Sequence, residues 1–213
     1  MKNRPEQDVL RAWQELQNSF QLNERQMAQF KQYMTLLLKW NEEISLTTIT
    51  QPYHVIQSHF FDSLKGAEYI TEHQIKMIAD IGSGPGFPGI PLKILFPHLN
   101  VVLIEVTGKK IAFLKEVIQA LELEGIEIYT LDWRTFLRKA TYPIDLFVTR
   151  AALEIEELLR VYKPSSPYKH VPVIYWASHL WNVEPRFAQY VAAQYPYNVG
   201  NKSRKLVLFK PVP

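Results

Sequence analysis

The stretch DIGSGPGFPG, residues 80–89, decides how the rest of this chain is interpreted. It follows a short apolar run, Lys76–Ile81, which predicts a buried strand, and it precedes Ile90–Phe96, which predicts a helix. Glycines at the end of a strand allow positive φ angles and let a ligand approach the main chain closely. In an open α/β sheet such a turn lies at the carboxyl ends of the strands, where ligands bind.

The spacing of these glycines disfavours a dinucleotide. Gly82, Gly84 and Gly86 form a G-x-G-x-G pattern, whereas the dinucleotide fingerprint is G-x-G-x-x-G. Pro85 and Pro88 also remove N–H donors from the region that would hold a pyrophosphate. A nucleoside cofactor without phosphates, such as S-adenosylmethionine (SAM), fits this turn better.

An acidic residue follows the glycine turn at a suitable distance. Glu105 ends the next β-rich run, 21 residues after Gly84. A carboxylate in this place can accept hydrogen bonds from both ribose hydroxyls of a bound nucleoside. A surface carboxylate at a strand end would look the same in the sequence, so the assignment depends on the turn and the acid together.

The chain alternates between strand and helix patterns after residue 75. Continuous apolar runs of this kind are typical of a mainly parallel sheet with helices on both faces. We therefore expect a doubly wound α/β domain over 75–213, preceded by a helical extension over 1–74. The expected strands are Lys76–Ile81, Val101–Glu105, Ile126–Tyr129, Ile144–Thr149, Val171–Trp176 and Leu206–Phe209; the expected helices are Ile90–Phe96, Lys109–Leu123, Asp132–Lys139, Ala151–Tyr162 and Pro185–Ala193.

The front of the chain carries helical periodicity and a capping signal. Asn23 with Gln26 three residues later predicts a capped helix start, and Pro52 starts a further helical stretch toward Leu64. The start of the chain has no signal-peptide pattern, and the apolar runs are too short to cross a bilayer, so we expect a cytoplasmic protein without a membrane partner.

Composition excludes several kinds of chemistry. The 213 residues include no cysteine, which rules out disulfides, thiolate metal sites and a cysteine nucleophile. The six histidines show no metal-ligand spacing, so we expect no metal. The net charge is +3, but the segment 160–213 holds eight basic residues against one acid, Glu184, so its net charge is +7. This basic end suggests a polyanionic partner, although a solvated basic face would give the same count.

Two long stretches closely resemble one protein family. The runs DIGSGPGFPGIPLKILFP and LIEVTGKKIAFLKEV, together with LLLKWNEEISLTTI (36–49), HFFDSL (59–64) and VTRAA (148–152), are similar to the RsmG (glucose-inhibited division protein B) family. The resemblance covers about 27–160 well, and the C-terminal third diverges. It implies a class I SAM-dependent methyltransferase that modifies guanine N7 in 16S ribosomal RNA, with ribosomal RNA or the 30S subunit as partner.

The resemblance also implies site residues. Together with the glycine turn, it gives the expected cofactor-binding residues as Gly82, Ser83, Gly84, Gly86, Phe87, Glu105, Trp133, Arg134 and Arg150. Arg150 is also the expected catalytic residue, orienting a base or phosphate; the alternative is a strand-end arginine paired with a helix carboxylate such as Glu154. The family commonly has a small residue followed by Glu where this chain has Trp133-Arg134, and a guanidinium has no acceptor for an adenine amino group. His59 and Asp62 could contact the substrate or join the helical extension to the sheet, and the joining role is the favoured interpretation of both.

Two sequence features that the chain lacks limit the kinds of atom that it could methylate. Methylation of an exocyclic amine usually involves an N/D-P-P-Y segment after the fourth strand, where this chain has Val148-Thr149-Arg150-Ala151, and C5 methylation normally needs a cysteine. A ring nitrogen with a free lone pair needs no general base. Two alternatives stay open: a methyltransferase acting on another RNA or a small molecule, and a non-catalytic homologue that binds SAM or RNA. We expect a monomer, with Lys202, Arg204 and Lys205 facing RNA phosphates.

Overall fold

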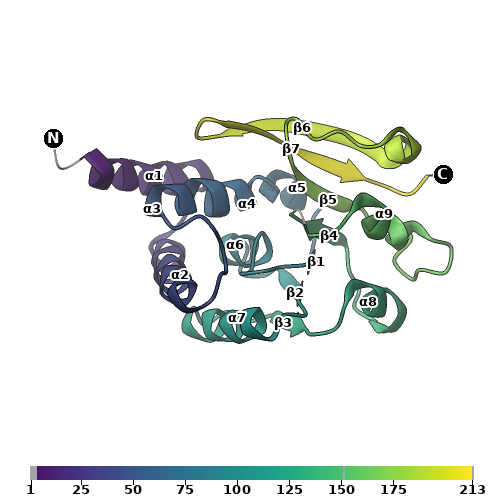
Figure 1. The fold of residues 1–213 in the computed structure, drawn as a ribbon, viewed down its shortest axis with the longest axis horizontal. Coiled ribbons are helices and arrows are strands. Elements are labelled where there is room, and N and C mark those ends of the chain that lie inside the picture. Colours follow the sequence, from purple (N-terminus) through teal and green to yellow (C-terminus); the bar gives the residue numbers. More distant parts are fainter. Residues whose placement is uncertain (1–3, 151, 213) are drawn as a thin grey trace.

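The computed structural model describes residues 4–150 and 152–212, and it contains one seven-stranded sheet. The strand order is β3-β2-β1-β4-β5-β7-β6 (Figure 1). The first five strands in the chain pair in parallel, and the β6–β7 hairpin adds antiparallel strands at one edge. The strands are β1 (Met77–Ile81), β2 (Asn100–Ile104), β3 (Ile126–Tyr129), β4 (Leu146–Thr149), β5 (Val173–Ser178), β6 (Val191–Val199) and β7 (Lys202–Phe209).

Helices precede the sheet and connect its strands. The capping box that Asn23 and Gln26 predicted is present at the start of the second helix, since each side chain accepts the other residue's backbone N–H. The helices are α1 (Arg4–Phe20), α2 (Glu24–Glu43), α3 (Pro52–Val55), the π-helix η1 (Ile56–Phe61), α4 (Asp62–Leu64), α5 (Ala67–Glu72), α6 (Gly89–Leu95), α7 (Gly108–Ala120), α8 (Trp133–Lys139), α9 (Ile155–Leu158), and the 3₁₀-helices η2 (Leu159–Tyr162) and η3 (Pro185–Tyr190). None of the helices within the described ranges is long and apolar enough to cross a membrane.

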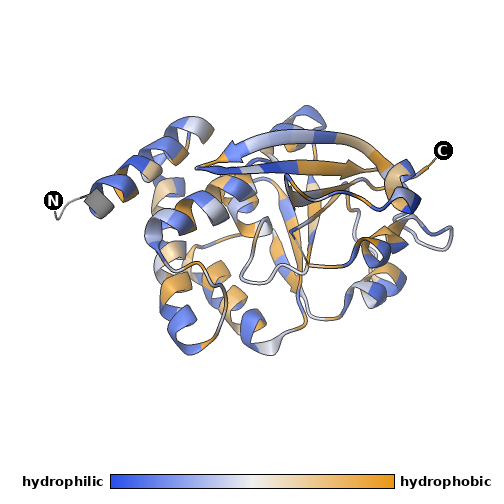
Figure 2. Cartoon of the chain, turned by 45° about the horizontal axis from the view of Figure 1, so that its top comes forward, coloured by the Kyte–Doolittle hydropathy of each residue, from blue (hydrophilic) through white to orange (hydrophobic). Residues whose placement is uncertain are grey.

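Both faces of the sheet are buried, which confirms the doubly wound arrangement. Successive residues of β1 alternate between two hydrophobic clusters: Ile78 belongs to one, and Ala79 and Ile81 belong to the other. The first cluster is covered by α2, α6 and α7, and the second by α8 and α9. Figure 2 shows hydrophobic residues along the central strands, between helices whose outer sides are hydrophilic. A strand buried on both faces needs a continuous apolar sequence, which is why these runs could be recognised.

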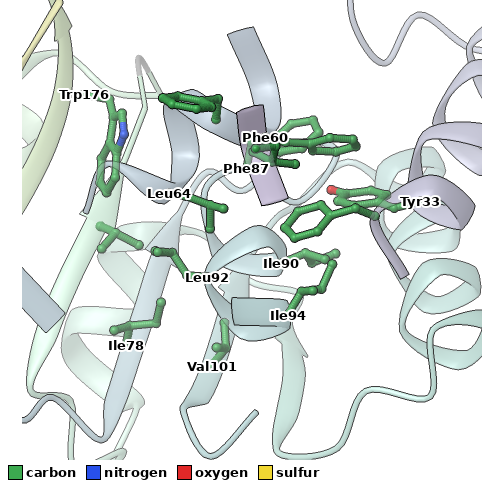
Figure 3. Close-up of a cluster of buried hydrophobic side chains, with 14 of the residues drawn as sticks. Tyr33, Phe60, Leu64, Ile78, Phe87, Ile90, Leu92, Ile94, Val101 and Trp176 are labelled. Atoms are coloured by element: carbon green, nitrogen blue, oxygen red, sulfur yellow. The ribbon is translucent and has the colours of Figure 1, made fainter. Parts of the chain in front are cut away.

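The helical extension shares its core with the sheet. Tyr33 of α2 and Phe60 of η1 pack against Phe87 of the glycine turn, with ring centroids 5.3 and 6.0 Å from that of Phe87. Figure 3 shows these rings beside Ile90 of α6, with Ile78 of β1 in the same cluster. One hydrophobic cluster therefore runs across residue 74, and the division of the chain at 74/75 stays a prediction.

Two of the expected helices differ from the structure. The stretch Pro185–Ala193 is not one helix: η3 ends at Tyr190, and β6 follows it, a strand that the sequence did not reveal. Pro196 lies within β6 and obscures its alternating pattern, but proline is tolerated there because β6 is an edge strand. The expected helix Ala151–Tyr162 starts only at Ile155 and tightens into η2, and Ala151 itself lies outside the described residues.

A buried carboxylate joins three parts of the fold. Asp62 of α4 has a side chain that is 2% exposed, and its Oδ2 lies 3.0 Å from Nη1 of Arg150, which follows β4. Its Oδ1 lies 2.7 Å from Nε of Arg204 in β7 and accepts a hydrogen bond from the hydroxyl of Tyr197 in β6. The indole of Trp176 in β5 donates to the Asp62 carbonyl. Asp62 thus connects the helical extension, the central sheet and the C-terminal hairpin, as its interpretation from the sequence expected.

Replacing Asp62 by Asn should strongly destabilise the protein. The amide keeps one acceptor oxygen, but its NH₂ group would face a guanidinium and leave two partly buried arginines without a counter-charge. Breaking a buried ion pair from one side typically costs about 3–5 kcal/mol, and we expect a loss of about 3 kcal/mol in the free energy of unfolding, measured by urea denaturation.

Glu122→Gln is the matched control for this prediction. Glu122 pairs with Arg25 at 3.8 Å, but the two side chains are 82% and 72% exposed. Solvent-exposed pairs contribute about 0–1 kcal/mol, so this variant should unfold at nearly the wild-type urea concentration. If both substitutions lower the free energy of unfolding equally, the contacts of Asp62 do not hold the helical extension, the central sheet and the C-terminal hairpin together.

Candidate functional site

A cavity of about 480 Å³ lies at the carboxyl ends of β1, β2 and β4. Its size is within the range of roughly 300–1,000 Å³ that is typical of small-molecule sites. The position agrees with the general location of ligands in open α/β sheets. It is lined by Leu46, Thr47, His59, Ile81, Gly82, Ser83, Gly84, Pro85, Phe87, Ile104, Glu105, Val106, Lys110, Asp132, Trp133, Arg150, Ala152 and Leu153.

The glycine turn forms one wall of the cavity. Gly82 and Gly84 have φ angles of 67° and 58°, which side-chain-bearing residues rarely adopt. A Cβ at Gly82 would lie 2.4 Å from the Cβ of Ala152, so this glycine is needed for packing. A Cβ at Gly84 would meet only the Gly82 carbonyl, at 3.9 Å. Gly84 therefore exposes bare backbone to the cavity, where a ligand can approach the main chain.

The helical extension supports this turn from behind. The hydroxyl of Tyr33 in α2 donates to the carbonyl of Pro85, and the Tyr33 ring is stacked with that of Phe87. A Cβ at Gly86 would lie 2.7 Å from the Tyr33 hydroxyl oxygen and 2.5 Å from Ile90 Cδ1. Gly86 is thus required by packing, and the structure does not place it in the cavity lining.

Glu105 lines the cavity, but its carboxylate also organises the backbone. It is 6% exposed, and its Oε2 accepts a hydrogen bond from the N–H of Gly84 at 2.9 Å. Its Oε1 accepts from the N–H groups of Val106 and Thr107, at 3.0 and 2.8 Å. An ionised carboxylate offers about four acceptor sites, so capacity remains for a ligand hydroxyl. The sequence predicted the acid at this place but not its role in holding the glycine turn.

A polar wall begins directly after β4. The guanidinium of Arg150 donates to the carbonyl of Ser58 and to Asp62, and its Nη2 lies 3.1 Å from Nδ1 of His59. The imidazole of His59 is stacked on Phe87, with the ring centroids 4.5 Å apart and the planes at 7°. The guanidinium carbon of Arg150 is 5.1 Å from the centre of the same ring. Arg150 and His59 are therefore held rigidly over Phe87 at the edge of the cavity.

Two buried groups near this wall have perturbed pKa values. Burial, assisted by the positive charges of Arg150 and Lys202, lowers the pKa of His59 to about 3, so its ring is neutral near pH 7. Burial raises the pKa of Asp80 to about 7, against the hydrogen bond that its Oδ2 accepts from the N–H of Gly89. His59 therefore presents no imidazolium to the cavity, and Asp80 is not among the residues that line it.

The start of α8 brings a residue that the sequence interpretation missed. Trp133 lines the cavity as expected, but the neighbouring Arg134 does not; its Nε lies 2.7 Å from Oε1 of Glu157, and its side chain is 58% exposed. Asp132 lines the cavity instead, at the N-cap of α8, where its Oδ1 accepts from the Thr135 N–H. The capping pattern could have indicated Asp132, because an N-cap side chain lies beside the preceding strand end.

Comparison with known proteins identifies the family. The family model described as rRNA small subunit methyltransferase G matches residues 26–179. A ribosomal RNA small subunit methyltransferase G from Brevibacillus brevis is 34% identical over 191 residues, which cover 89% of this chain and 78% of that protein. The chain belongs to the rRNA small subunit methyltransferase G family.

Matches to other curated relatives are closer but shorter. The proteins of the same name from an Exiguobacterium species and from Bacillus subtilis are 46% and 44% identical over 110 and 104 residues. These matches cover 52% and 49% of this chain, and 46% and 44% of those proteins. The chain thus spans about half the length of these curated relatives. The resemblance noted in the sequence is confirmed at the level of the family.

Solved structures show the class I methyltransferase fold, with its Rossmann-like sheet. A mutant of MtNAS in complex with S-adenosylmethionine has a TM-score of 0.57 at 17% identity, over 93% of this chain and 84% of that chain. The putative methyltransferase yhhF from Escherichia coli has a TM-score of 0.53 at 11% identity, over 70% and 86% of the two chains. At such identities the likeness concerns the fold alone.

The helical extension contributes to the cavity more than the sequence predicted. Gly82, Ser83, Gly84, Phe87, Glu105, Trp133 and Arg150, which the family resemblance and the turn pattern indicated, all line it. Leu46, Thr47 and His59 come from the loop after α2 and from η1. His59 was interpreted as structural, yet it both packs on Phe87 and faces the cavity. The sequence left contact with the substrate open as an alternative role for His59, and the structure places the residue in the cavity lining.

The lowered pKa of His59 predicts a pH effect on stability. In the unfolded chain a histidine has a pKa of about 6.5. Between that value and about 3, the unfolded chain binds a proton that the folded protein does not. The contribution of His59 to the free energy of unfolding is therefore complete above pH 6.5 and decreases as the pH falls, by at most about 1.4 kcal/mol per pH unit.

Comparison with His59→Asn isolates this effect. The Asn carbonyl can still accept from Arg150, but the side chain does not titrate. Asp80, with its raised pKa, makes stability decrease as the pH rises toward 7, but this contribution is common to both proteins and cancels in the difference. Urea denaturation between about pH 4.5 and pH 7.5 should show the variant gaining stability relative to the wild type as the pH falls. A difference that is constant with pH would contradict a neutral buried His59.

Proposed function

We propose that this protein is a SAM-dependent methyltransferase that modifies guanine N7 in 16S ribosomal RNA of the small subunit. The observation that carries this proposal is the cavity itself. On one side of β1 it offers the bare backbone of Gly84 and the carboxylate of Glu105, and on the other side the fixed guanidinium of Arg150. The relatives of the same family are named as methyltransferases of ribosomal RNA from the small subunit.

The residues present fit SAM as the cofactor. The open space at Gly84 accommodates a group that lies against the main chain, and the one acceptor site of Glu105 that the backbone leaves free can accept a ribose hydroxyl. Asp132 at the start of α8 offers the acceptor for an adenine amino group that Arg134 cannot provide. When bound, SAM supplies an electrophilic methyl group on its sulfonium. Ser83 and Trp133 complete the wall at these positions and help to exclude water.

The polar groups around the cavity favour an acceptor that loses no proton. Both nitrogens of His59 are engaged, with Arg150 and with Thr47, and its lowered pKa makes it a poor base. The carboxylate of Glu105 is held by three backbone N–H groups. Guanine N7 has a free lone pair and no proton, so the residues need only orient it and exclude water. This agrees with the absence of a cysteine and of an N/D-P-P-Y segment in the sequence.

One lysine of α7 and one lysine of the basic C-terminal segment are suited to RNA. Lys110 lines the cavity, and Lys202 at the start of β7 is exposed but close enough to His59 to lower its pKa. Arg204 is different from what the charge pattern indicated, because its guanidinium is paired with Asp62 inside the fold. We propose that Lys110 and Lys202 approach the phosphates of ribosomal RNA, that the protein acts in the cytoplasm, and that it acts as a monomer.

Methyl transfer to ribosomal particles tests the function. Labelled SAM would be incubated with 30S subunits and with naked 16S RNA, both from cells that lack this modification, and the modified base would be mapped. Label at a guanine N7 supports the proposal. Label at another position or on another RNA would favour a different acceptor, and SAM binding without transfer would indicate a non-catalytic homologue.

Gly84→Ala should block SAM without greatly weakening the fold. The added methyl group projects into the cavity, where the cofactor would approach the backbone. We expect SAM affinity to fall at least about tenfold by calorimetry, which corresponds to about 1.4 kcal/mol. The positive φ of 58° at this position should cost about 1–2 kcal/mol in stability.

Gly200→Ala separates the two effects. Gly200 has a similar φ of 54° at the tip of the β6–β7 hairpin, and a Cβ there would meet only the Tyr53 hydroxyl, at 3.8 Å. It should lose similar stability but bind SAM like the wild type. If Gly84→Ala also binds SAM like the wild type, the cofactor does not lie against this turn.

A further inference from the structure

We propose that Thr47 selects the methyl acceptor, by donating a hydrogen bond from its hydroxyl to a ring carbonyl oxygen beside the nitrogen that is methylated. This inference rests on the proposed function and concerns the acceptor side of the same cavity. Thr47 follows α2 in the loop that leads to α3, and it lines the cavity together with His59 and Arg150.

The first step is the tautomer of His59. Nη2 of Arg150 lies 3.1 Å from Nδ1 of His59. A guanidinium can only donate hydrogen bonds, so Nδ1 must be the acceptor in this contact. Because the ring is neutral, its one proton is then on Nε2. Nε2 lies 2.9 Å from Oγ1 of Thr47 and therefore donates to it.

The second step is the hydroxyl of Thr47. Its oxygen accepts from His59 Nε2, and it also accepts from the backbone N–H of Ile49 at 3.1 Å. A hydroxyl has two lone pairs and one proton, so both acceptor positions of Thr47 are used. The proton remains to be donated, and no acceptor for it is found among the residues that the structure describes. Thr47 is thus a donor that cannot act as an acceptor.

The third step is the rigidity of this donor. Oδ1 of Asn41, in the last turn of α2, accepts from the backbone N–H groups of Leu46 and Thr47, each at 2.8 Å. His59 is fixed in turn by its stacking on Phe87. A donor that is positioned before the acceptor binds discriminates more sharply than a mobile one, because little order is lost on binding.

A fixed donor of this kind distinguishes the two purines. Guanine presents two acceptors side by side, N7 and O6, whereas adenine presents N7 beside an amino group, which is a donor. With N7 directed at the methyl group, O6 of guanine can accept from the Thr47 hydroxyl. The amino group of adenine would face the same proton, and Thr47 has no lone pair left with which to accept from it. The Thr47 hydroxyl therefore favours binding of guanine and disfavours binding of adenine.

The test compares guanine and adenine at the mapped target position. Small subunits would be reconstituted from transcribed 16S RNA with either base there, and kcat/KM for methyl transfer would be measured. Thr47→Val should lower kcat/KM on guanine about tenfold, as expected for one neutral hydrogen bond, and should lower the guanine-to-adenine ratio at least about tenfold. Thr47→Ser keeps the hydroxyl and should restore both values.

Matched measurements separate specificity from structure. SAM affinity should be unchanged in these variants, and Thr48→Val, at an exposed neighbouring position outside the cavity lining, should behave like the wild type. Thr47→Ala provides a second loss of the hydroxyl if the valine variant is poorly folded. If Thr47→Val or Thr47→Ala is active and keeps the wild-type ratio of kcat/KM on guanine to kcat/KM on adenine, the role of Thr47 is overturned but the proposed function is not. A wild-type protein that binds SAM but methylates no subunit overturns the proposed function as well.

Discussion

The carboxylate of Asp62 is almost completely buried, and it is the point at which three separate parts of the chain meet. It contacts Arg150 after β4 and Arg204 in β7, while it belongs itself to the helical extension. Buried charges are costly unless they are paired. Loss of either arginine contact would therefore leave the buried carboxylate of Asp62 without part of its counter-charge. The position of Arg150, and with it the polar wall of the cavity, therefore depends on Asp62 together with the Ser58 carbonyl and His59, which also contact the guanidinium.

From Arg150 the constraint extends to the chemistry of the cavity. The guanidinium fixes the tautomer of His59, and His59 fixes the hydroxyl of Thr47. The ring of Phe87 in the glycine turn packs against both the imidazole of His59 and the guanidinium of Arg150. The helical extension is thus more than a cover for the sheet. In the proposed function, it supplies the side of the cavity for the methyl acceptor, while β1 and β2 supply the side for the cofactor.

The glycine turn shows how one motif can serve two purposes. Gly84 leaves space for a ligand, whereas Gly82 and Gly86 are required because Ala152, Tyr33 and Ile90 pack against them. The spacing of the three glycines does not distinguish these roles. Only the packed neighbours do, and two of these, Tyr33 and Ala152, lie far away in the sequence.

The sequence by itself determined the fold class, the strands β1 to β5, the glycine turn and the acid at position 105. These features follow from local patterns: apolar runs, capping residues and glycines with a fixed relation to a strand end. Tertiary structure alone decided that Arg134 points away to Glu157, that Thr47 lines the cavity, that Arg204 is paired inside the fold, and that β6 forms an edge strand. The physical reason is that each depends on partners distant in the chain, which bring their charges and hydrogen-bonding groups together only when the sheet and the extension pack.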